Sequence, residues 1–166
     1  MPRWIERDEA VRRIEAAGAT ACPLCDAAAA DHGLTIATTE EAVVVLTPYP
    51  RFWGHLLVIS RAHVLTFTDL PDATWATMNT LTLRAARLLE STLAPTRCYV
   101  ASLGVARDDL PMSFPHIHLH VIPVDDDALR PADVFTWRHG VMEAEAEEWE
   151  GLAERLRAAW AAGTPG

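Results

Sequence analysis

Three histidines alternate with apolar residues in the segment SFPHIHLHVIP, residues 113–123, at positions His116, His118 and His120. Residues two apart in an extended strand point to the same side at a spacing of roughly 6.6 Å, so the imidazoles are expected to form a row. Imidazoles accept or hold a proton near neutral pH, and such a row suits binding and attacking an anion such as phosphate. The same spacing also suits metal ligation, and the solvated face of an edge strand is the plainest alternative. The pattern favours phosphate chemistry first and a metal-dependent enzyme second.

The cysteines form a second group that could do chemistry. Cys22 and Cys25 make a C-x-x-C pair, and the third cysteine of the chain, Cys98, stands alone in an apolar run where core packing is its expected role. In a reducing compartment such a pair indicates metal binding or redox chemistry in preference to a structural disulfide. Both readings of the pair remain open on this spacing alone.

The charge balance limits the partners of the protein. The chain carries 23 Asp and Glu residues against 14 Lys and Arg residues, a formal charge of -9, and has no run of basic residues. This argues against nucleic-acid and anionic-membrane binding, and it leaves a polyanionic small molecule if a few positive groups are focused in a cleft. No apolar run approaches the ~20 residues of a membrane span, and the N-terminus does not lead into a signal-peptide core. We therefore expect a soluble cytoplasmic protein.

The length of 166 residues suits one domain over residues 1–166. Its core is expected at about residues 21–124, preceded by a helix within residues 1–20 that stops at Gly18. Residues 125–166 should form an extension that contains an amphipathic helix.

The elements that must position the histidines follow from periodicity. Apolar residues at three- and four-residue steps from Pro71 to Ala94 indicate a long helix, which Pro95 ends. Short strands are expected at residues 34–37, 42–46, 55–60, 98–103 and 116–122. Strands, one long helix and then more strands predict an α+β fold: a mostly antiparallel sheet of about five strands with the long helix packed on it and a helix at each end.

With these elements in place, three ordered blocks resemble the histidine triad (HIT) family of nucleotide hydrolases and transferases. The segment HIHLHVI at residues 116–122 matches the His-φ-His-φ-His-φ-φ signature of the family, where φ is apolar. The segment from Pro50 through GHLLVI at residues 54–59 to His63 is similar to a second family block, and CPLC at residues 22–25 is similar to the N-terminal C-x-x-C. The ordered set covers roughly residues 21–123 and is far more specific than one block alone.

The resemblance implies roles for several residues. His118 would attack the α-phosphorus of a nucleotide and form a covalent nucleotidyl-histidine, while His120 would contact the phosphate and His116 would complete the triad. The resemblance also places Ser113 beside the leaving group, His55 behind the triad and Thr47 at the ribose. A turn hydroxyl is an equal alternative for Ser113, and a core histidine is one for His55.

The resemblance further implies a structural zinc ion held by Cys22, Cys25, His63 and His116, and no organic cofactor. Two thiolates and two imidazoles are a ligand set that zinc prefers. The competing redox reading is weaker because such a pair is usually placed in a thioredoxin-like βαβ unit, which this segment lacks.

The sequence departs from the family pattern at several positions. Thr47 stands where Asp or Asn is usual and offers only one hydroxyl to a ribose. Two arginines of the loops, Arg51 and Arg107, offer positive charge, although a solvated surface position is expected for each. Trp137 and His139 lie in the extension, for which a stabilising helix is favoured over a cap on the base pocket or on a dimer interface.

The predicted function is hydrolysis of, or nucleotidyl transfer from, a nucleoside phosphoramidate or dinucleoside polyphosphate. The resemblance also implies a purine-type nucleotide as substrate and a homodimer. A nucleotide-binding module of the same fold with weak catalysis is the alternative, and Thr47 motivates it.

Overall fold

The computed structural model describes residues 1–16, 21–29, 33–104, 112 and 114–163. Its helices and strands, in chain order, are β1 (Arg3–Ile5), α1 (Arg7–Ala16), α2 (Pro23–Ala29), β2 (Thr35–Thr38), β3 (Ala42–Leu46), β4 (Leu56–Ser60), α3 (Asp72–Leu93), β5 (Arg97–Ala101), β6 (His118–Val124), α4 (Pro131–Phe135), β7 (Val141–Glu143) and α5 (Ala146–Ala162).

The predicted α+β fold is confirmed. Five strands form an antiparallel sheet in the order β2-β3-β4-β6-β5, with β4 at its centre. The near-continuous apolar run of β4 reflects this position, since all five of its residues are buried. Strands β4 and β6 lie side by side, so the two segments that carry the histidine motifs are neighbours in the sheet.

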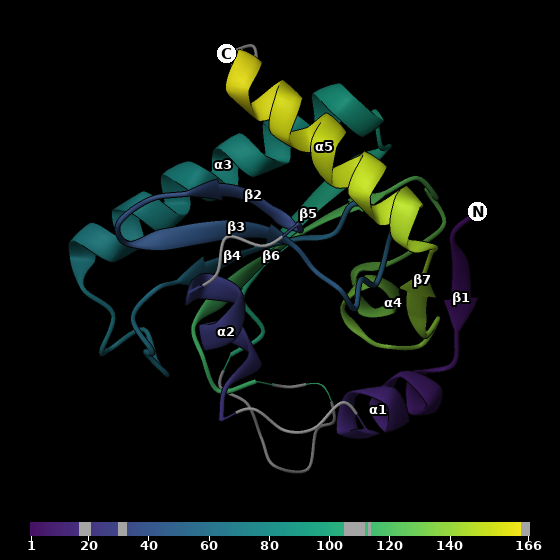
Figure 1. Ribbon diagram of the computed structural model, residues 1–166, viewed down its shortest axis with the longest axis horizontal. Helices are drawn as coiled ribbons and strands as arrows, with labels where there is room; N and C mark the ends of the chain where they lie inside the picture. The colour runs from purple at the N-terminus through teal and green to yellow at the C-terminus, as the bar shows by residue number, and fades with distance from the viewer. Residues whose placement is uncertain (17–20, 30–32, 105–111, 113, 164–166) are drawn as a thin grey trace.

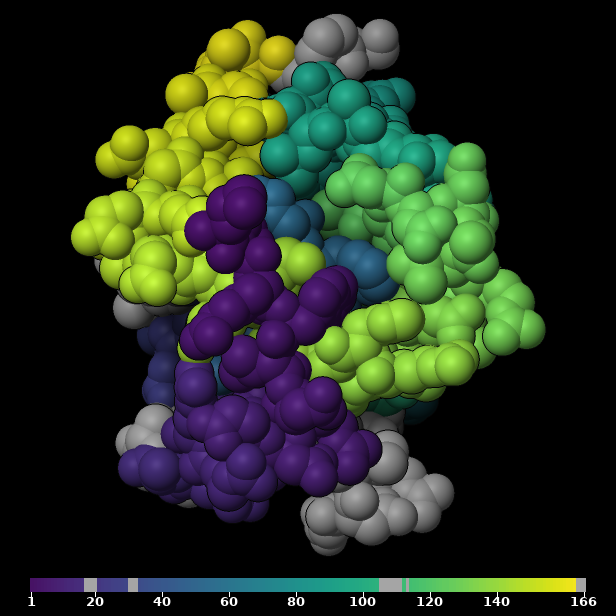
Figure 2. Space-filling model, turned by 90° about the vertical axis from the view of Figure 1, so that its right-hand side faces the viewer, coloured from purple at the N-terminus to yellow at the C-terminus, as the bar shows by residue number. Residues whose placement is uncertain are grey.

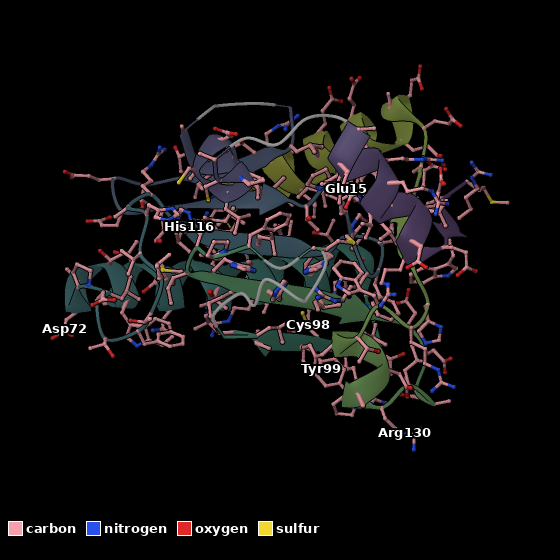
Figure 3. The ribbon with its side chains drawn as sticks, turned by 90° about the horizontal axis from the view of Figure 1, so that it is seen from below. Glu15, Asp72, Cys98, Tyr99, His116 and Arg130 are labelled. Atoms are coloured by element: carbon pink, nitrogen blue, oxygen red, sulfur yellow. The ribbon has the colours of Figure 1, made fainter. Side chains whose placement is uncertain are left out.

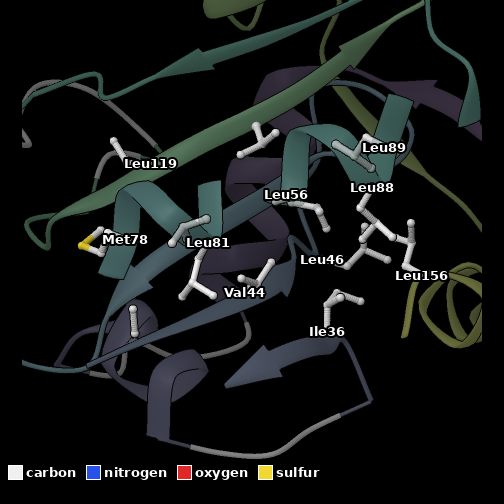
Figure 4. Packing of buried hydrophobic residues seen from close by; sticks show 14 of the residues in the cluster. Ile36, Val44, Leu46, Leu56, Met78, Leu81, Leu88, Leu89, Leu119 and Leu156 are labelled. Carbon is white, nitrogen blue, oxygen red and sulfur yellow. The ribbon is translucent and has the colours of Figure 1, made fainter. Parts of the chain in front are cut away.

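One face of the sheet packs against the long helix α3 and the C-terminal helix α5 (Figure 1). Alternate strand residues such as Val44, Leu46 and Leu56 point to this face and meet Leu88 and Leu89 of α3 (Figure 4). This period of two along each strand, met by the three- and four-residue period of α3, explains the apolar pattern of the sequence.

The opposite face carries the short helix α2 and the functional side chains. Val43, Val45, Leu57 and Ile59 point to this side and contact Leu24 of α2. Helix α2, which begins directly after Cys22 and contains Cys25, therefore covers the face of the sheet on which His118 and His120 lie.

The N-terminal strand and the C-terminal extension meet in a second sheet, which the sequence did not predict. Strand β1 pairs with β7 in antiparallel register, with Trp4 opposite Met142. Arg3 and Arg13 both bind the carboxylate of Glu143. In Figure 2 the purple N-terminal segment accordingly lies across the yellow-green C-terminal segment. These contacts fold the extension back over residues 50–53, where the backbone N–H of Met142 donates to the carbonyl of Pro50 at 2.9 Å.

The predicted bounds of several strands differ from the structure by one or two residues, and the difference at β6 affects the site. The N-terminal helix runs over residues 7–16, and the predicted stop at Gly18 lies outside the described residues. Strand β6 begins at His118, so His116 lies before the strand and not within it. The extension forms α4 and β7 as well as the expected amphipathic helix, α5.

No helix in the described part of the chain combines the length and the apolar character needed to cross a membrane.

Candidate functional site

His118 and His120 are presented on one face of β6 by simple alternation. Leu119, between the two histidines, and Val121, directly after His120, point to the α3 face and are buried there. The register places His118 opposite Ile59 and His120 opposite Leu57 of β4. The two imidazole rings are 4.8 Å apart between centroids and lie nearly perpendicular to each other.

The hydrogen bond of His118 determines which of its nitrogens is basic. Nδ1 of His118 lies 2.6 Å from the backbone carbonyl oxygen of His116, and because that oxygen only accepts, Nδ1 must carry the proton. The neutral ring therefore keeps its lone pair on Nε2. His118 is half-buried and lines a pocket of about 510 Å³, so the ring has a nucleophilic nitrogen at the edge of a ligand-sized space.

A chain of hydrogen bonds behind the triad determines the state of His120 in the same way. The backbone N–H of Arg51 donates to Nδ1 of His55 at 3.2 Å, so the proton of neutral His55 lies on Nε2. Nε2 of His55 lies 3.0 Å from Nδ1 of His120 and donates to it. His120 must then carry its own proton on Nε2. The ring consequently presents an N–H donor on the side away from His55.

Burial keeps these imidazoles neutral. It lowers the pKa of His118, and it lowers the pKa values of His55 and His120 well below the ordinary range for histidine. The positive charge of Arg51 adds to the effect on all three rings. In the free protein His120 thus supplies a hydrogen-bond donor and no positive charge.

The pocket in front of the histidines has an apolar wall and a polar end. Pro23, Leu24 and Ala27 of α2 line it together with Val45 and Leu57 of the sheet, which suits a flat apolar group such as a base.

The predicted ribose residue, Thr47, also lines this pocket, just after β3. Its side chain is buried, and its hydroxyl oxygen accepts the backbone N–H of Tyr49 at 3.3 Å. One lone pair and the hydroxyl proton of Thr47 remain for a ligand.

The expected surface position of Arg51 is wrong. Its side chain is only 5% exposed, lines the same pocket, and places Nη1 3.4 Å from Nδ1 of His120. The guanidinium carbon lies 4.0 Å from the centroid of the Trp137 ring. Arg107 lies outside the described residues.

The extension therefore contributes to the site instead of only stabilising the fold. Trp137 lies between α4 and β7, outside any helix, and lines the pocket. His139 is exposed, and its ring lies 5.9 Å from that of Trp4 between centroids, tilted by 48°.

The second cluster brings together all four predicted metal ligands. Sγ of Cys22 and Sγ of Cys25 lie 3.5 and 3.4 Å from Nδ1 of His116, and Sγ of Cys25 lies 3.1 Å from Nδ1 of His63. One ligand atom from each residue lies within 4.8 Å of the others. His116 is labelled in Figure 3. Its ring faces this cluster, 5.0 Å from the ring of His63, because its backbone lies before the start of β6.

The donor set and its spacing fit a zinc ion. Zn–S bonds of about 2.3 Å and Zn–N bonds of about 2.0 Å in a tetrahedron separate the ligand atoms by roughly 3.3 to 3.8 Å. Nε2 of His116 lies 2.7 Å from the carbonyl oxygen of Ser60 and donates to it, so Nδ1 is the bare nitrogen that faces the thiols. Burial and the neighbouring Cys22 raise the pKa of Cys25, so a cation at this position would stabilise the thiolates.

Sequence reasoning missed Ser60. It named Arg51 and Trp137 but favoured a solvated surface position for Arg51 and a stabilising helix for the segment of Trp137. Ser60 orients His116 through its carbonyl, and its position at the end of the GHLLVI block was the available signal. Arg51 lies in the block that runs from Pro50 to His63, and its place between Pro50 and His55 was the available signal that it belongs to the site. Nothing local distinguishes Trp137. The predicted leaving-group residue, Ser113, lies outside the described residues.

Comparisons with known proteins agree on one family. A family model described as HIT domain matches residues 31–127. An uncharacterised HIT-like protein of Mycobacterium tuberculosis is 29% identical over 120 residues, which cover 72% of this chain and 77% of that protein. An AP-4-A phosphorylase of the same species is 30% identical over 94 residues, 56% of this chain, and the match spans about half of that enzyme, 47%. The crystal structure of a Zn-bound histidine triad family protein from Mycobacterium smegmatis is 30% identical, with a TM-score of 0.62 over 86% of this chain and 94% of that one.

Proposed function

Because this chain belongs to the HIT family, we propose that it is a nucleotide hydrolase or nucleotidyl transferase that works through a covalent intermediate on His118. The observation that carries the proposal is the 2.6 Å hydrogen bond from Nδ1 of His118 to the carbonyl of His116, which leaves Nε2 unprotonated beside the pocket. An imidazole in this state is a good nucleophile, and it is a good leaving group once it carries a phosphoryl group.

The first step exchanges one bond to phosphorus for another. Nε2 of His118 forms a bond to the α-phosphorus, and the bond from phosphorus to the leaving group breaks with its electron pair going to the leaving group. An amine leaving group also takes up a proton from solvent, whereas a phosphate leaves as an anion. The N–H at Nε2 of His120 would bind an oxygen of the phosphoryl group as charge builds up there.

The second step releases the nucleotide. Water or another acceptor forms a bond to the α-phosphorus and loses a proton, while the bond to Nε2 of His118 breaks. The carbonyl of His116 holds the proton on Nδ1 throughout, so the ring returns to the same tautomer.

The test is to trap the intermediate. The protein is mixed with an adenosine phosphoramidate or a diadenosine polyphosphate, and the reaction is quenched in denaturant without acid. The mass of the protein and of its peptides is then measured by mass spectrometry. We expect a mass increase of one nucleotidyl group on the peptide that contains His118. His118→Ala should form no adduct and lose at least ~10³-fold in kcat/KM while keeping its fold. A folded wild-type protein that gives neither adduct nor product with several substrates would refute the proposal.

The second candidate is a binding module with weak catalysis, and Thr47 favours it. A buried threonine that already accepts the Tyr49 N–H holds a ribose less firmly than a carboxylate would. Calorimetry separates the two candidates, since tight nucleotide binding without turnover supports the module and rapid turnover excludes it.

Zinc at the cluster of Cys22, Cys25, His63 and His116 would be structural. Four protein ligands close the coordination sphere, so the ion supplies no open position for substrate. The ion would link α2, which lines one side of the pocket, to the residues just before β6. The Zn-bound relative supports this assignment.

A homodimer is part of the proposal as well. Strand β5 is at the edge of the described sheet, and its Val100 is 49% exposed. An apolar edge strand is a ready pairing surface for a second copy. Sedimentation velocity should give a dimer for the wild type and a monomer for Val100→Lys.

A further inference from the structure

Arg51 is a buried cation that the proposed chemistry leaves without a function. Its side chain is 5% exposed and lines the pocket. Its Nε is buried and has no hydrogen-bond partner among the described residues. No ion pair in the described ranges involves it, although Arg3, Arg13, Arg97 and Arg138 all have carboxylate partners there. A buried charge without an oppositely charged group beside it is costly, so a buried cation at a pocket indicates an anionic ligand.

Trp137 supports the guanidinium without using its donors. The guanidinium carbon lies 4.0 Å from the ring centroid of Trp137, a cation–π contact over the face of the indole. The N–H groups of arginine lie in the guanidinium plane, so a ring stacked on that plane does not occupy them. Nη1 lies 3.4 Å from Nδ1 of His120, and the buried Nε has no partner among the described residues, so it is available to an anion.

The position of Arg51 relative to the triad determines which part of a substrate it could meet. Arg51 and His118 both lie next to His120: Nη1 of Arg51 is 3.4 Å from its Nδ1, and the ring centroids of His118 and His120 are 4.8 Å apart. All three side chains line the same pocket. A ligand with two phosphoryl groups in this pocket could therefore meet His118 and His120 with one group and Arg51 with the other.

We propose that Arg51 and Trp137 form a second anion subsite, which binds a phosphoryl group adjacent to the one that His118 would attack. The inference rests on the proposed function for the position of the first phosphoryl group. The substrate class that follows is nucleoside polyphosphates, in preference to phosphoramidates with an uncharged leaving group.

Charge and geometry both support this class. The planar guanidinium group of arginine can donate two parallel hydrogen bonds to two oxygens of one phosphoryl group. Desolvation lowers the pKa of Arg51 to about 10, so the group still carries its charge at neutral pH while the imidazoles around it are neutral. In a chain with a formal charge of -9, this arginine focuses positive charge in the cleft, which a polyanionic ligand requires.

Calorimetry on the full chain tests the subsite without depending on turnover. The ligands are AMP and α,β-methylene ADP, which cannot be split between its two phosphorus atoms, both in buffer free of divalent cations. We expect the wild type to bind the diphosphate at least about tenfold more tightly than AMP, the gain typical of hydrogen bonds to a charged group. Arg51→Gln should bind the diphosphate no more tightly than AMP, and Arg51→Lys should keep part of the preference for the diphosphate.

Arg84→Gln is the matched control. Arg84 stacks on Trp160 at 4.1 Å, so this substitution removes the same charge and the same kind of contact between α3 and α5, outside the pocket. It should keep the wild-type preference for the diphosphate. Thermal unfolding checks that each variant is folded.

Two results would overturn the inference: equal affinity of the wild type for the two nucleotides, or a folded Arg51→Gln protein that keeps the preference. The wild-type comparison holds even if Arg51→Gln does not fold. A clear preference without any adduct on His118 would refute only the proposed catalysis, whereas an adduct without the preference would refute only the subsite.

Discussion

Nε2 of His55 lies 3.0 Å from Nδ1 of His120, and the two rings are 5.1 Å apart between centroids, both buried behind the pocket. His55 is therefore more than a packed core histidine. Because its own Nδ1 accepts the backbone N–H of Arg51, it can only donate to His120, and the tautomer of His120 depends on it.

Removing this donor should change the tautomer of His120. His55→Phe removes the shorter of the two contacts at Nδ1 of His120 and leaves only Nη1 of Arg51 at 3.4 Å, so the proton is expected to distribute over both nitrogens and kcat/KM to fall by about 10²-fold. Nitrogen-15 NMR of the imidazoles gives the direct measurement. The wild type should show an unprotonated Nδ1 on His120 at neutral pH, and a protonated Nδ1 there would contradict the proposed chain of hydrogen bonds.

The buried imidazoles should make the protein sensitive to mild acid. The pKa values of His55 and His120 are lowered well below the ordinary value by burial, so the folded state binds fewer protons than the unfolded state. The free energy of unfolding should then be level above the unfolded pKa of about 6.5 and fall below it by up to about 1.4 kcal/mol per pH unit for each imidazole.

Chemical denaturation at pH values from about 7.5 to about 5.5 measures this slope. His120→Asn should lower it by the contribution of one imidazole. His139→Gln is the control, since it removes an exposed histidine outside the pocket. A stability that does not change over this range would show that the two rings become protonated in the folded protein as readily as in the unfolded chain.

Loss of a zinc ligand should lower both metal content and stability. We expect Cys22→Ser to reduce zinc from one ion per chain to a small fraction and to lower the midpoint of thermal unfolding, because metal binding is coupled to folding. Elemental analysis after dialysis gives the metal content. Cys98→Ser, at a half-buried cysteine of β5 outside the cluster, should keep its zinc. Zinc that survives Cys22→Ser would instead place a metal on the triad.

The backbone at Gly54 should tolerate no side chain. Gly54 precedes His55 with φ +86, and an added Cβ would lie 2.4 Å from Cδ1 of Leu93. Gly54→Ala is expected to destabilise the protein by about 1–3 kcal/mol and to lower activity by displacing His55.

Gly151→Ala separates this effect from a general effect of alanine. Gly151 lies inside α5 with open space around an added Cβ, so alanine should stabilise the protein by about 0.5–1 kcal/mol. Leu93→Ala in combination with Gly54→Ala would relieve the contact, and comparison with Leu93→Ala alone subtracts the packing lost with the leucine side chain. Denaturant midpoints for Gly54→Ala, Leu93→Ala and the double variant then measure the contact and the positive φ separately.

The sequence alone determined the features that depend on local period and spacing. Alternation put His118 and His120 on one face and Leu119 on the other, and the 3.6-residue period predicted α3 almost to its ends. The spacing of the C-x-x-C pair, together with the family resemblance, predicted which four side chains meet in the metal cluster. These patterns could be read because each strand or helix imposes its own geometry on neighbouring residues.

Only the tertiary structure decided what depends on segments far apart in the chain. The burial of Arg51 requires the return of the extension, which brings Trp137 onto the guanidinium and pairs β7 with β1. The direction of the His116 ring depends on the carbonyl of Ser60 on a neighbouring strand. A charged loop residue looks solvated in sequence because burial is the sum of contacts from every segment that packs around it, and no local pattern records that sum.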